Sequence, residues 1–329
     1  MRRCNTPRIT VFLFLAFWIL PQVANGQLRN TNGQESGVMG APRIQMLDAR
    51  SVGMADATIA DYTDITTINF NPANLSFVQN PAAVHLNTSQ MMRNNLLAGV
   101  ATFPVLNYRT HRIAAQMGFH YPGSYDRDWI YNQLDITLHP EPTIAMYQAD
   151  VAYAWSFEDL LSLGIMNNLS YAQKNGNQYW AYRPTVGVTY APSESISYGM
   201  VFRGPGTAIT YQLDDSGNTT ISDDWLQNSL EIGASFIYPV DTEVSYLALS
   251  LSNEKRFGES GLRYKGGLEV YVTPVLALRT GIIFQSDQVE YTPRFGFGVG
   301  RNLFRFDYAL SYRNQFNEHF HQLGFSYRF

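Results

Sequence analysis

The sequence predicts an all-β protein: a transmembrane antiparallel up-and-down β-barrel of about fourteen strands, with an N-terminal segment that plugs its interior. The 329 residues are 45% hydrophobic and 14% aromatic, yet the mean hydropathy is slightly negative at -0.18. Apolar and polar residues alternate with a period of two through most of the chain, as in strands with one apolar face. The chain also ends on Phe329 with apolar residues at every second position before it, which resembles the C-terminal assembly signal of bacterial outer-membrane barrels.

The composition excludes several classes of protein. Only 15% of the residues are charged, and Tyr and Phe are abundant, which is the opposite of a disordered chain. A single long apolar run excludes a polytopic helical membrane protein. The 23 basic residues are outnumbered by 27 acidic ones, so we expect no nucleic-acid partner.

The first 26 residues predict a cleaved secretory signal peptide. Arg2 and Arg3 precede an apolar run over residues 9–20, and Ala24-Asn25-Gly26 supplies small residues at the usual spacing for cleavage. The alternative, a retained N-terminal anchor, requires a longer apolar run. We therefore expect export to the outer membrane of a Gram-negative bacterium.

The only cysteine, Cys4, lies within this predicted signal peptide. The mature chain would therefore contain no disulfide, no thiolate metal site and no cysteine nucleophile. It must gain its stability by other means.

Residues 27–81 predict a compact, turn-rich plug rather than membrane-spanning strands. Small residues and glycine are frequent around 48–57, and carboxylates follow at Asp61 and Asp64. Asn71-Pro72-Ala73 then favours a turn. Such a segment would fit inside a wide barrel.

Residues 82–329 predict the barrel itself. In the last three runs, over 289–299, 304–312 and 323–329, aromatic and aliphatic residues alternate with charged residues and glycine. Short turn signals separate the runs, whereas we expect longer polar loops over 125–142, 174–178 and 214–224. Tight turns at one end and longer loops at the other are typical of outer-membrane barrels.

A soluble β-sandwich, propeller or repeat protein is the alternative fold. The apolar face carries more Phe and Tyr than a sandwich core needs, which favours a face toward lipid. Charges recur on the opposite face, where a polar lumen would accept them. These charges either pair across the interior and stiffen the wall, which we favour, or line a channel and hold the plug. The residues concerned are Arg263, Lys265, Glu269, Arg294, Arg305, Asp307 and Arg328.

No motif predicts an enzyme, a metal site or a cofactor. The glycines of 296–300 alternate along a strand and precede no helix, so we interpret them as lumen-facing rather than phosphate-binding. His319 and His321 share one face but bring no further ligand, and the acidic stretch over 214–224 lacks EF-hand spacing. The sequence also lacks Gly-x-Ser-x-Gly and His-Glu-x-x-His.

Two short motifs carry a family resemblance. Ala49-Arg50-Ser51 followed by Gly53-Met54, then an Asp-rich step, then Asn71-Pro72-Ala73 with Leu75, resembles the N-terminal region of the FadL/TodX superfamily. That superfamily includes the PorV/PorQ-type barrels of Bacteroidetes-like bacteria. The family's Ala-Asp-Asp run is replaced here by residues 60–64, and Asn74 stands where the family has glycine. Residues 201–205 are weakly similar to a mid-barrel Arg-x-Pro stretch.

The resemblance implies a fourteen-stranded plugged barrel with one of two functions. The first is a FadL-like channel for the uptake of hydrophobic small molecules, in which the kink at Asn71, Pro72 and Ala73 gates the ligand. The alternative is a PorV/PorQ-like component of type IX protein secretion that acts through protein–protein contacts, which the short chain and modest loops favour. Outer-membrane lipid, an apolar ligand or secretion proteins would be the partners.

Overall fold

A computed structural model of the chain describes most of the predicted plug and barrel. No described helix is long and apolar enough to cross a membrane. In parts of several strands only the backbone is described, and the predicted signal peptide lies outside the described residues. These are 48–78, 83–91, 94–108, 110–122, 145–174, 177–204, 206–213, 219–226, 228–238, 246–258, 260–287, 290–301, 303–313 and 318–328.

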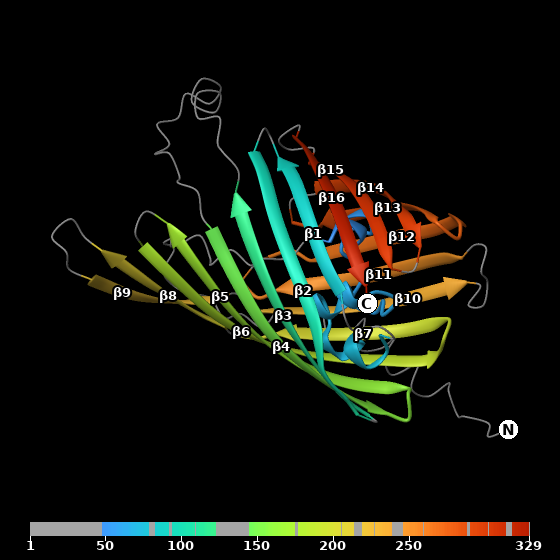
Figure 1. Ribbon diagram of the computed structural model, residues 1–329, viewed down its shortest axis with the longest axis horizontal. Coiled ribbons are helices and arrows are strands. Elements are labelled where there is room, and N and C mark those ends of the chain that lie inside the picture. Colours follow the sequence, from blue (N-terminus) through green and yellow to red (C-terminus); the bar gives the residue numbers. More distant parts are fainter. Residues whose placement is uncertain are drawn as a thin grey trace.

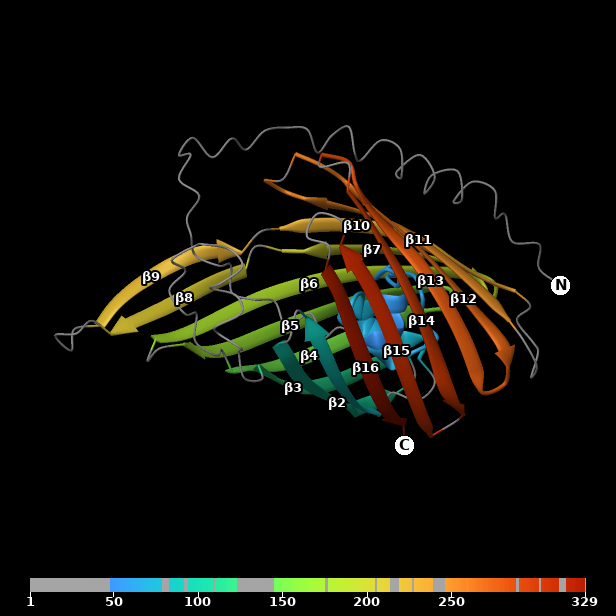
Figure 2. The same ribbon diagram turned by 90° about the horizontal axis from the view of Figure 1, so that it is seen from above.

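Fourteen antiparallel strands close into a ring, as the alternation predicts (Figures 1 and 2). Each strand pairs with its neighbours, and the first and last strands close the ring, with Ala83 opposite Arg328. The strands are β1 (Ala83–Met91), β2 (Asn94–Tyr108), β3 (His111–Pro122), β4 (Ala145–Phe157), β5 (Leu161–Lys174), β6 (Asn177–Ser193), β7 (Ile196–Arg203), β10 (Ser229–Tyr238), β11 (Leu247–Arg256), β12 (Arg263–Thr273), β13 (Leu276–Gln285), β14 (Glu290–Arg301), β15 (Phe304–Arg313) and β16 (Glu318–Arg328).

Two further strands form a hairpin that extends the sheet beside β6. The strand β8 (Gly206–Leu213) pairs with residues 178–182 of β6, and β9 (Thr219–Leu226) pairs with β8. The expected loop over 214–224 is therefore wrong in its second half, because β9 begins within it. The polar, Thr-rich sequence of β9 resembles a loop, and its pairing with β8 makes it a strand.

The two ends of the barrel differ in their connections. At one end, named the turn end, two or three residues join β4 to β5, β6 to β7, β12 to β13 and β14 to β15. The opposite end, the loop end, holds the connection from β3 to β4, where the predicted loop 125–142 lies outside the described residues. The expected loop over 174–178 is wrong, because β5 runs to Lys174 and β6 begins at Asn177.

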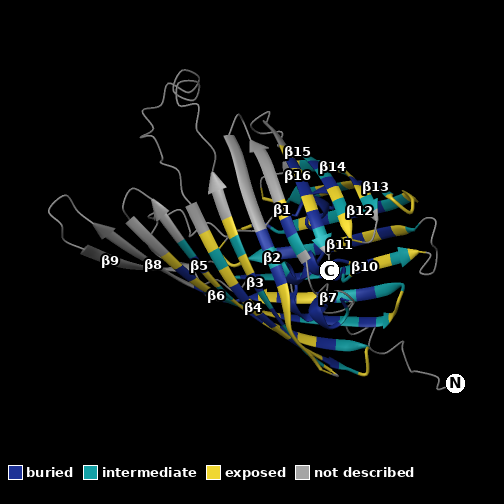
Figure 3. Ribbon diagram, viewed as in Figure 1, coloured by how far each residue is buried: buried dark blue, intermediate teal, exposed yellow. Residues whose placement is uncertain are grey.

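Buried and exposed residues alternate along the strands (Figure 3), and the exposed set is mainly apolar whereas much of the buried set is polar. On β16, the side chains of Leu323 and Phe325 are 40% and 42% exposed, whereas those of Gln322 and Ser326 are 1% and 5% exposed. Pairing of every strand in a closed ring satisfies the backbone without water, so this outer face can lie in lipid.

Residues 48–78 form three short helical turns inside the ring (Figures 1 and 2). They are α2 (Ala49–Gly53), η1 (Ile65–Asn69) and η2 (Pro72–Ser76). The side chains of Asp48, Asp64 and Asn71 cap them by accepting hydrogen bonds from backbone N–H groups. Helices this short are unstable in isolation, so contacts with the wall must hold them in place.

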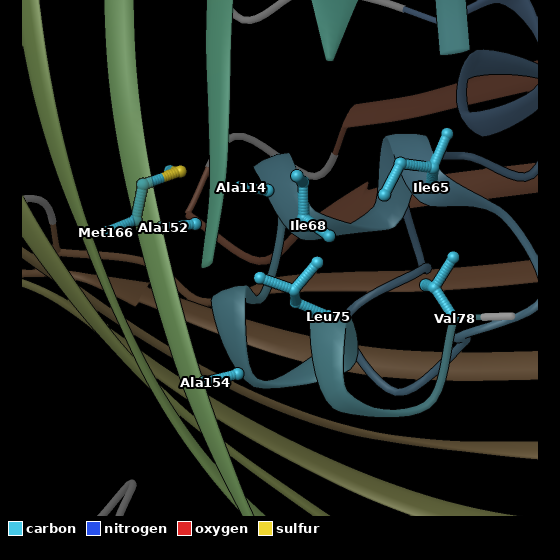
Figure 4. Packing of buried hydrophobic residues seen from close by; sticks show 8 residues of the cluster. All are labelled: Ile65, Ile68, Leu75, Val78, Ala114, Ala152, Ala154 and Met166. Atoms are coloured by element: carbon cyan, nitrogen blue, oxygen red, sulfur yellow. The ribbon is translucent and has the colours of Figure 1, made fainter. Parts of the chain in front are cut away.

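An apolar cluster joins this segment, which we name the plug, to strands β3, β4 and β5 (Figure 4). Ile65, Ile68, Leu75 and Val78 face Ala114, Ala152, Ala154 and Met166 of the wall. Alanine leaves room for the larger plug side chains. Burial of each large aliphatic group contributes about 1.5–3 kcal/mol to stability.

Candidate functional site

The candidate site is the interface between plug and wall, and its first element is a belt of inward-facing glycines. A Cβ atom on any of them would lie within 3.3 Å of a plug atom. Six of the seven form three cross-strand pairs, so the wall is locally smooth and the plug backbone approaches it closely. The glycine belt consists of Gly164, Gly187, Gly199, Gly233, Gly267, Gly281 and Gly296. It includes one of the predicted lumen-facing glycines of 296–300.

Asn71 fastens the plug to β6. Its Nδ2 atom donates hydrogen bonds to the carbonyl oxygen of Val188 at 3.1 Å, to Thr189 Oγ1 at 2.9 Å and to the plug carbonyl of Ile59 at 2.9 Å. Its Oδ1 atom accepts a hydrogen bond from the N–H of Ala73 at 3.1 Å. Buried amides that use both ends in this way hold the chain in one conformation.

Asn74 repeats the arrangement one turn later. Thr189 Oγ1 donates to its Oδ1 atom at 2.7 Å, and its Nδ2 atom donates to the carbonyl oxygen of Asp61 at 2.9 Å. Between the two amides, the backbone of Pro72 and Ala73 lies against Gly164 of β5. The predicted gating residues Asn71, Pro72 and Ala73 are thus all in contact with the wall, and their role as a gate stays a prediction.

The carboxylate of Glu269 on β12 is the centre of a buried ion-pair cluster. Arg50 of the plug donates to both of its oxygens, at 2.9 Å and 3.1 Å, and Arg279 of β13 also donates to it. Asp61 of the plug lies 2.7 Å from Arg50, and Arg305 of β15 lies 3.7 Å from Glu269. Charged side chains of the plug and of the wall therefore form a single ion-pair cluster.

Arg50 stays charged in this setting. Burial alone would lower the pKa of its guanidinium group. Asp61 and Glu269 outweigh the effect of burial and hold that pKa well above its usual value. The guanidinium group of Arg50 therefore carries its positive charge throughout the physiological pH range.

A second buried cluster surrounds Glu231 on β10. Arg203 of β7 lies 3.0 Å from one carboxylate oxygen, and Lys265 of β12 lies 2.9 Å from the other. Lys265 also contacts Glu254 of β11 at 2.9 Å. Arg203 reaches the plug as well, because its Nη2 atom donates to the carbonyl oxygen of Phe70 at 3.3 Å.

Two more arginines of the wall contact carboxylates of the plug. Arg294 of β14 lies 2.7 Å from Asp56, and Arg305 lies 3.4 Å from Asp64. Arg305 also contacts Asp307 of its own strand at 2.9 Å. The plug is thus charge-matched to the wall on the side formed by β12 to β15.

Five of the seven charges predicted to face the lumen lie in these ion pairs: Lys265, Glu269, Arg294, Arg305 and Asp307. Some of these charges pair with other residues of the wall, and some pair with residues of the plug. The network therefore contains both kinds of contact that the sequence suggested, pairing across the interior and contact with the plug. Arg263 is half-buried on β12, and the side chain of Arg328 lies outside the described residues.

Sequence reasoning missed the partners of these charges. They include Arg50, Asp56, Arg203, Glu231, Glu254 and Arg279. The wall residues among them occupy the inward positions of alternating strands, so the period of two could have identified them. Within the described residues, no group of acidic, His or Cys side chains is placed to hold a metal ion. His321 is exposed and contacts the hydroxyl of Tyr308 at 2.8 Å.

The strand pairing is irregular along one edge of β6, at a place that we name the wall seam: Arg183, Pro184 and Gly204. On β6, residues 178–182 pair with β8 and residues 185–193 pair with β7, so the partner of β6 changes from β8 to β7 across Arg183 and Pro184. The N–H of Gly204, between β7 and β8, donates to the carbonyl oxygen of Pro184 at 3.0 Å. Pro184 has no N–H to return a bond, which weakens the ladder here.

No protein-family model and no curated protein sequence matches this chain. The fold is similar to that of the Pseudomonas putida toluene transporter TodX, with a TM-score of 0.56 and 12% identity over 85% of this chain and 97% of that chain. It is also similar to the Ralstonia pickettii toluene transporter TbuX, with a TM-score of 0.56 and 12% identity over 86% of this chain and 98% of that chain. These likenesses confirm the predicted fold, a closed antiparallel β-barrel of fourteen strands.

Proposed function

We propose that this protein is an outer-membrane channel for small apolar molecules. The support is a closed ring with an apolar outer face, an interior occupied by a plug, and the fold of two barrels described as toluene transporters. Transport is the function that this combination of features supports best.

The observation that carries this proposal is the contrast between the buried plug and the irregular pairing at the wall seam. Within 48–78, only Thr63 is exposed. An apolar molecule that crossed this level between plug and wall would have to separate ion pairs such as that of Arg50 with Glu269, and in a buried site this costs several kcal/mol. The wall seam, where the hydrogen bond from Gly204 to Pro184 connects β6 to the segment between β7 and β8, requires far less disruption. We therefore propose that the molecule passes from the lumen through the wall seam into the membrane.

Fixing the plug tests this route. The Cβ atom of Ala55 and a Cβ atom built on Gly281 are 2.7 Å apart, so the double variant Ala55→Cys/Gly281→Cys can form a disulfide after a shift of about 1 Å. The predicted mature chain has no other cysteine. The assay is uptake of labelled toluene by Gram-negative cells that lack their own hydrocarbon channels and express the protein.

We expect the oxidised double variant to take up toluene as fast as its reduced form. Loss of uptake on oxidation, restored by a reductant, would instead assign the gate to the plug and to Asn71, Pro72 and Ala73. A wild-type protein that gives no uptake above the empty host, and that copurifies with secretion proteins, would contradict the channel and favour the role in type IX secretion.

A further inference from the structure

Two polar side chains lie together on the outer face of the barrel. Asn167 of β5 and Tyr182 of β6 are both exposed, and the hydroxyl of Tyr182 donates a hydrogen bond to Asn167 Oδ1 at 2.7 Å. The outward neighbours on the same strands are apolar: Ile165, Leu169 and Val186 are all exposed. A lone amide in an apolar face needs an explanation.

Aromatic side chains show the depth of this amide in the membrane. Asn167 pairs with Val151 of β4. On β4, Tyr147 lies four residues from Val151 toward the loop end, and Trp155 lies four residues from it toward the turn end. Tyr147 contacts Tyr171, and Trp155 contacts His111 and Phe157, as in the aromatic girdles that mark the two membrane surfaces. Asn167 is therefore about 13 Å along the strand from either girdle, at the middle of the hydrocarbon layer.

Only one of the two polar atoms of the Asn167 amide group has a hydrogen-bond partner among the described residues. Its Oδ1 atom accepts from Tyr182, but its Nδ2 atom has no hydrogen-bond partner among the described residues. Lipid chains supply no acceptor, so an unpaired N–H at this depth costs free energy in the resting barrel. An oxygen atom brought to this place would recover that cost.

The position of the amide connects it to the proposed path. Asn167 pairs directly with Pro184, and Pro184 accepts the hydrogen bond from Gly204 that bridges the wall seam. Tyr182 thus lies on β6, the strand that forms one edge of the seam, and Asn167 lies one strand away from the seam, on β5, directly opposite Pro184.

We infer that Asn167 Nδ2 is a hydrogen-bond donor that holds an oxygen atom of the solute as it passes the wall seam, with Tyr182 as the residue that positions the amide. The channel then prefers small apolar molecules with a carbonyl, carboxyl or hydroxyl oxygen over hydrocarbons of the same shape. This inference rests on the proposed channel function and names its solute class.

The test compares uptake of benzaldehyde and toluene, which differ by one carbonyl group, in wild type and in Asn167→Leu. Leucine suits a lipid-facing position, so the variant should fold, which its heat-modifiable mobility on gels checks. We expect the wild-type preference for benzaldehyde to fall roughly five-fold in the variant, as for the loss of one hydrogen bond, while toluene uptake is unchanged. Thr280→Val is the matched control, because Thr280 is also exposed on the outer face but lies on β13, away from the seam.

An equal preference in wild type and Asn167→Leu would overturn the inference and leave the channel intact. A change in the oligomeric state of Asn167→Leu in detergent, with the preference retained, would also overturn it and assign the amide to contact with a second copy. If wild type takes up neither solute, the channel itself is refuted.

Discussion

The Oδ1 atom of Asn71 occupies the place where a Cβ atom would stand on Gly187. The plug amide can therefore reach the carbonyl oxygen of Val188 and the hydroxyl of Thr189 only because β6 carries no side chain at that position. The relationship joins a motif near the N-terminus to a strand more than a hundred residues later.

Gly187→Ala should destabilise the barrel. The new methyl group would overlap the amide of Asn71, and overpacking of this kind costs about 1–3 kcal/mol. The measurement is the urea concentration at which the heat-modifiable folded band disappears. Gly266→Ala on β12 is the control, because its nearest contact would be an ordinary 3.4 Å from Leu251. Equal midpoints for the two variants would contradict the close packing of the belt.

Asn71→Ala should loosen the plug. The change removes four hydrogen bonds and leaves the carbonyl oxygen of Val188 without its side-chain donor, so we expect a loss of about 2–4 kcal/mol. Amide hydrogen exchange over residues 58–78 should accelerate before that of the strands. Asn69→Ala, at a half-exposed position of the same plug, is the control.

Glu269→Gln should cost about 3–5 kcal/mol of stability, because it leaves Arg50 and Arg279 buried beside a neutral amide. Urea unfolding again gives the value. Glu194→Gln, in the exposed turn between β6 and β7, should change stability by less than about 0.5 kcal/mol. A similar small effect at Glu269 would mean that the cluster does not hold the plug.

The turn from β4 to β5 should accept a more favourable sequence. Glu158 and Asp159 have φ values of 49° and 54°, a left-handed conformation in which Asn-Gly is the preferred pair. The double change Glu158→Asn/Asp159→Gly should raise the free energy of unfolding by about 1 kcal/mol. The same residues placed at Glu194 and Ser195, where φ is not positive, should give no gain.

The alternation of apolar and polar residues was enough to predict most of the fold and about half of the site from the sequence. Glu269 and Arg305 were identifiable because each alternates with apolar residues that face lipid. Their partners were not, because the contact between Arg50 and Glu269 spans 219 residues and no local pattern encodes it. The glycine belt was hidden for a related reason. From sequence alone, a glycine in a strand indicates only a position that weakens the strand, and its packing against the plug becomes evident only in the structure.

Strand lengths give the barrel an uneven rim. β6 has 17 residues and β11 has 10. With a tilt near 40°, they rise roughly 43 Å and 25 Å, against an apolar band about 25 Å tall. The β6 side, extended by β8 and β9, is therefore taller than the β11 side. For the proposed channel, a solute that approaches the loop end therefore has freer access over the β11 side than over the β6 side.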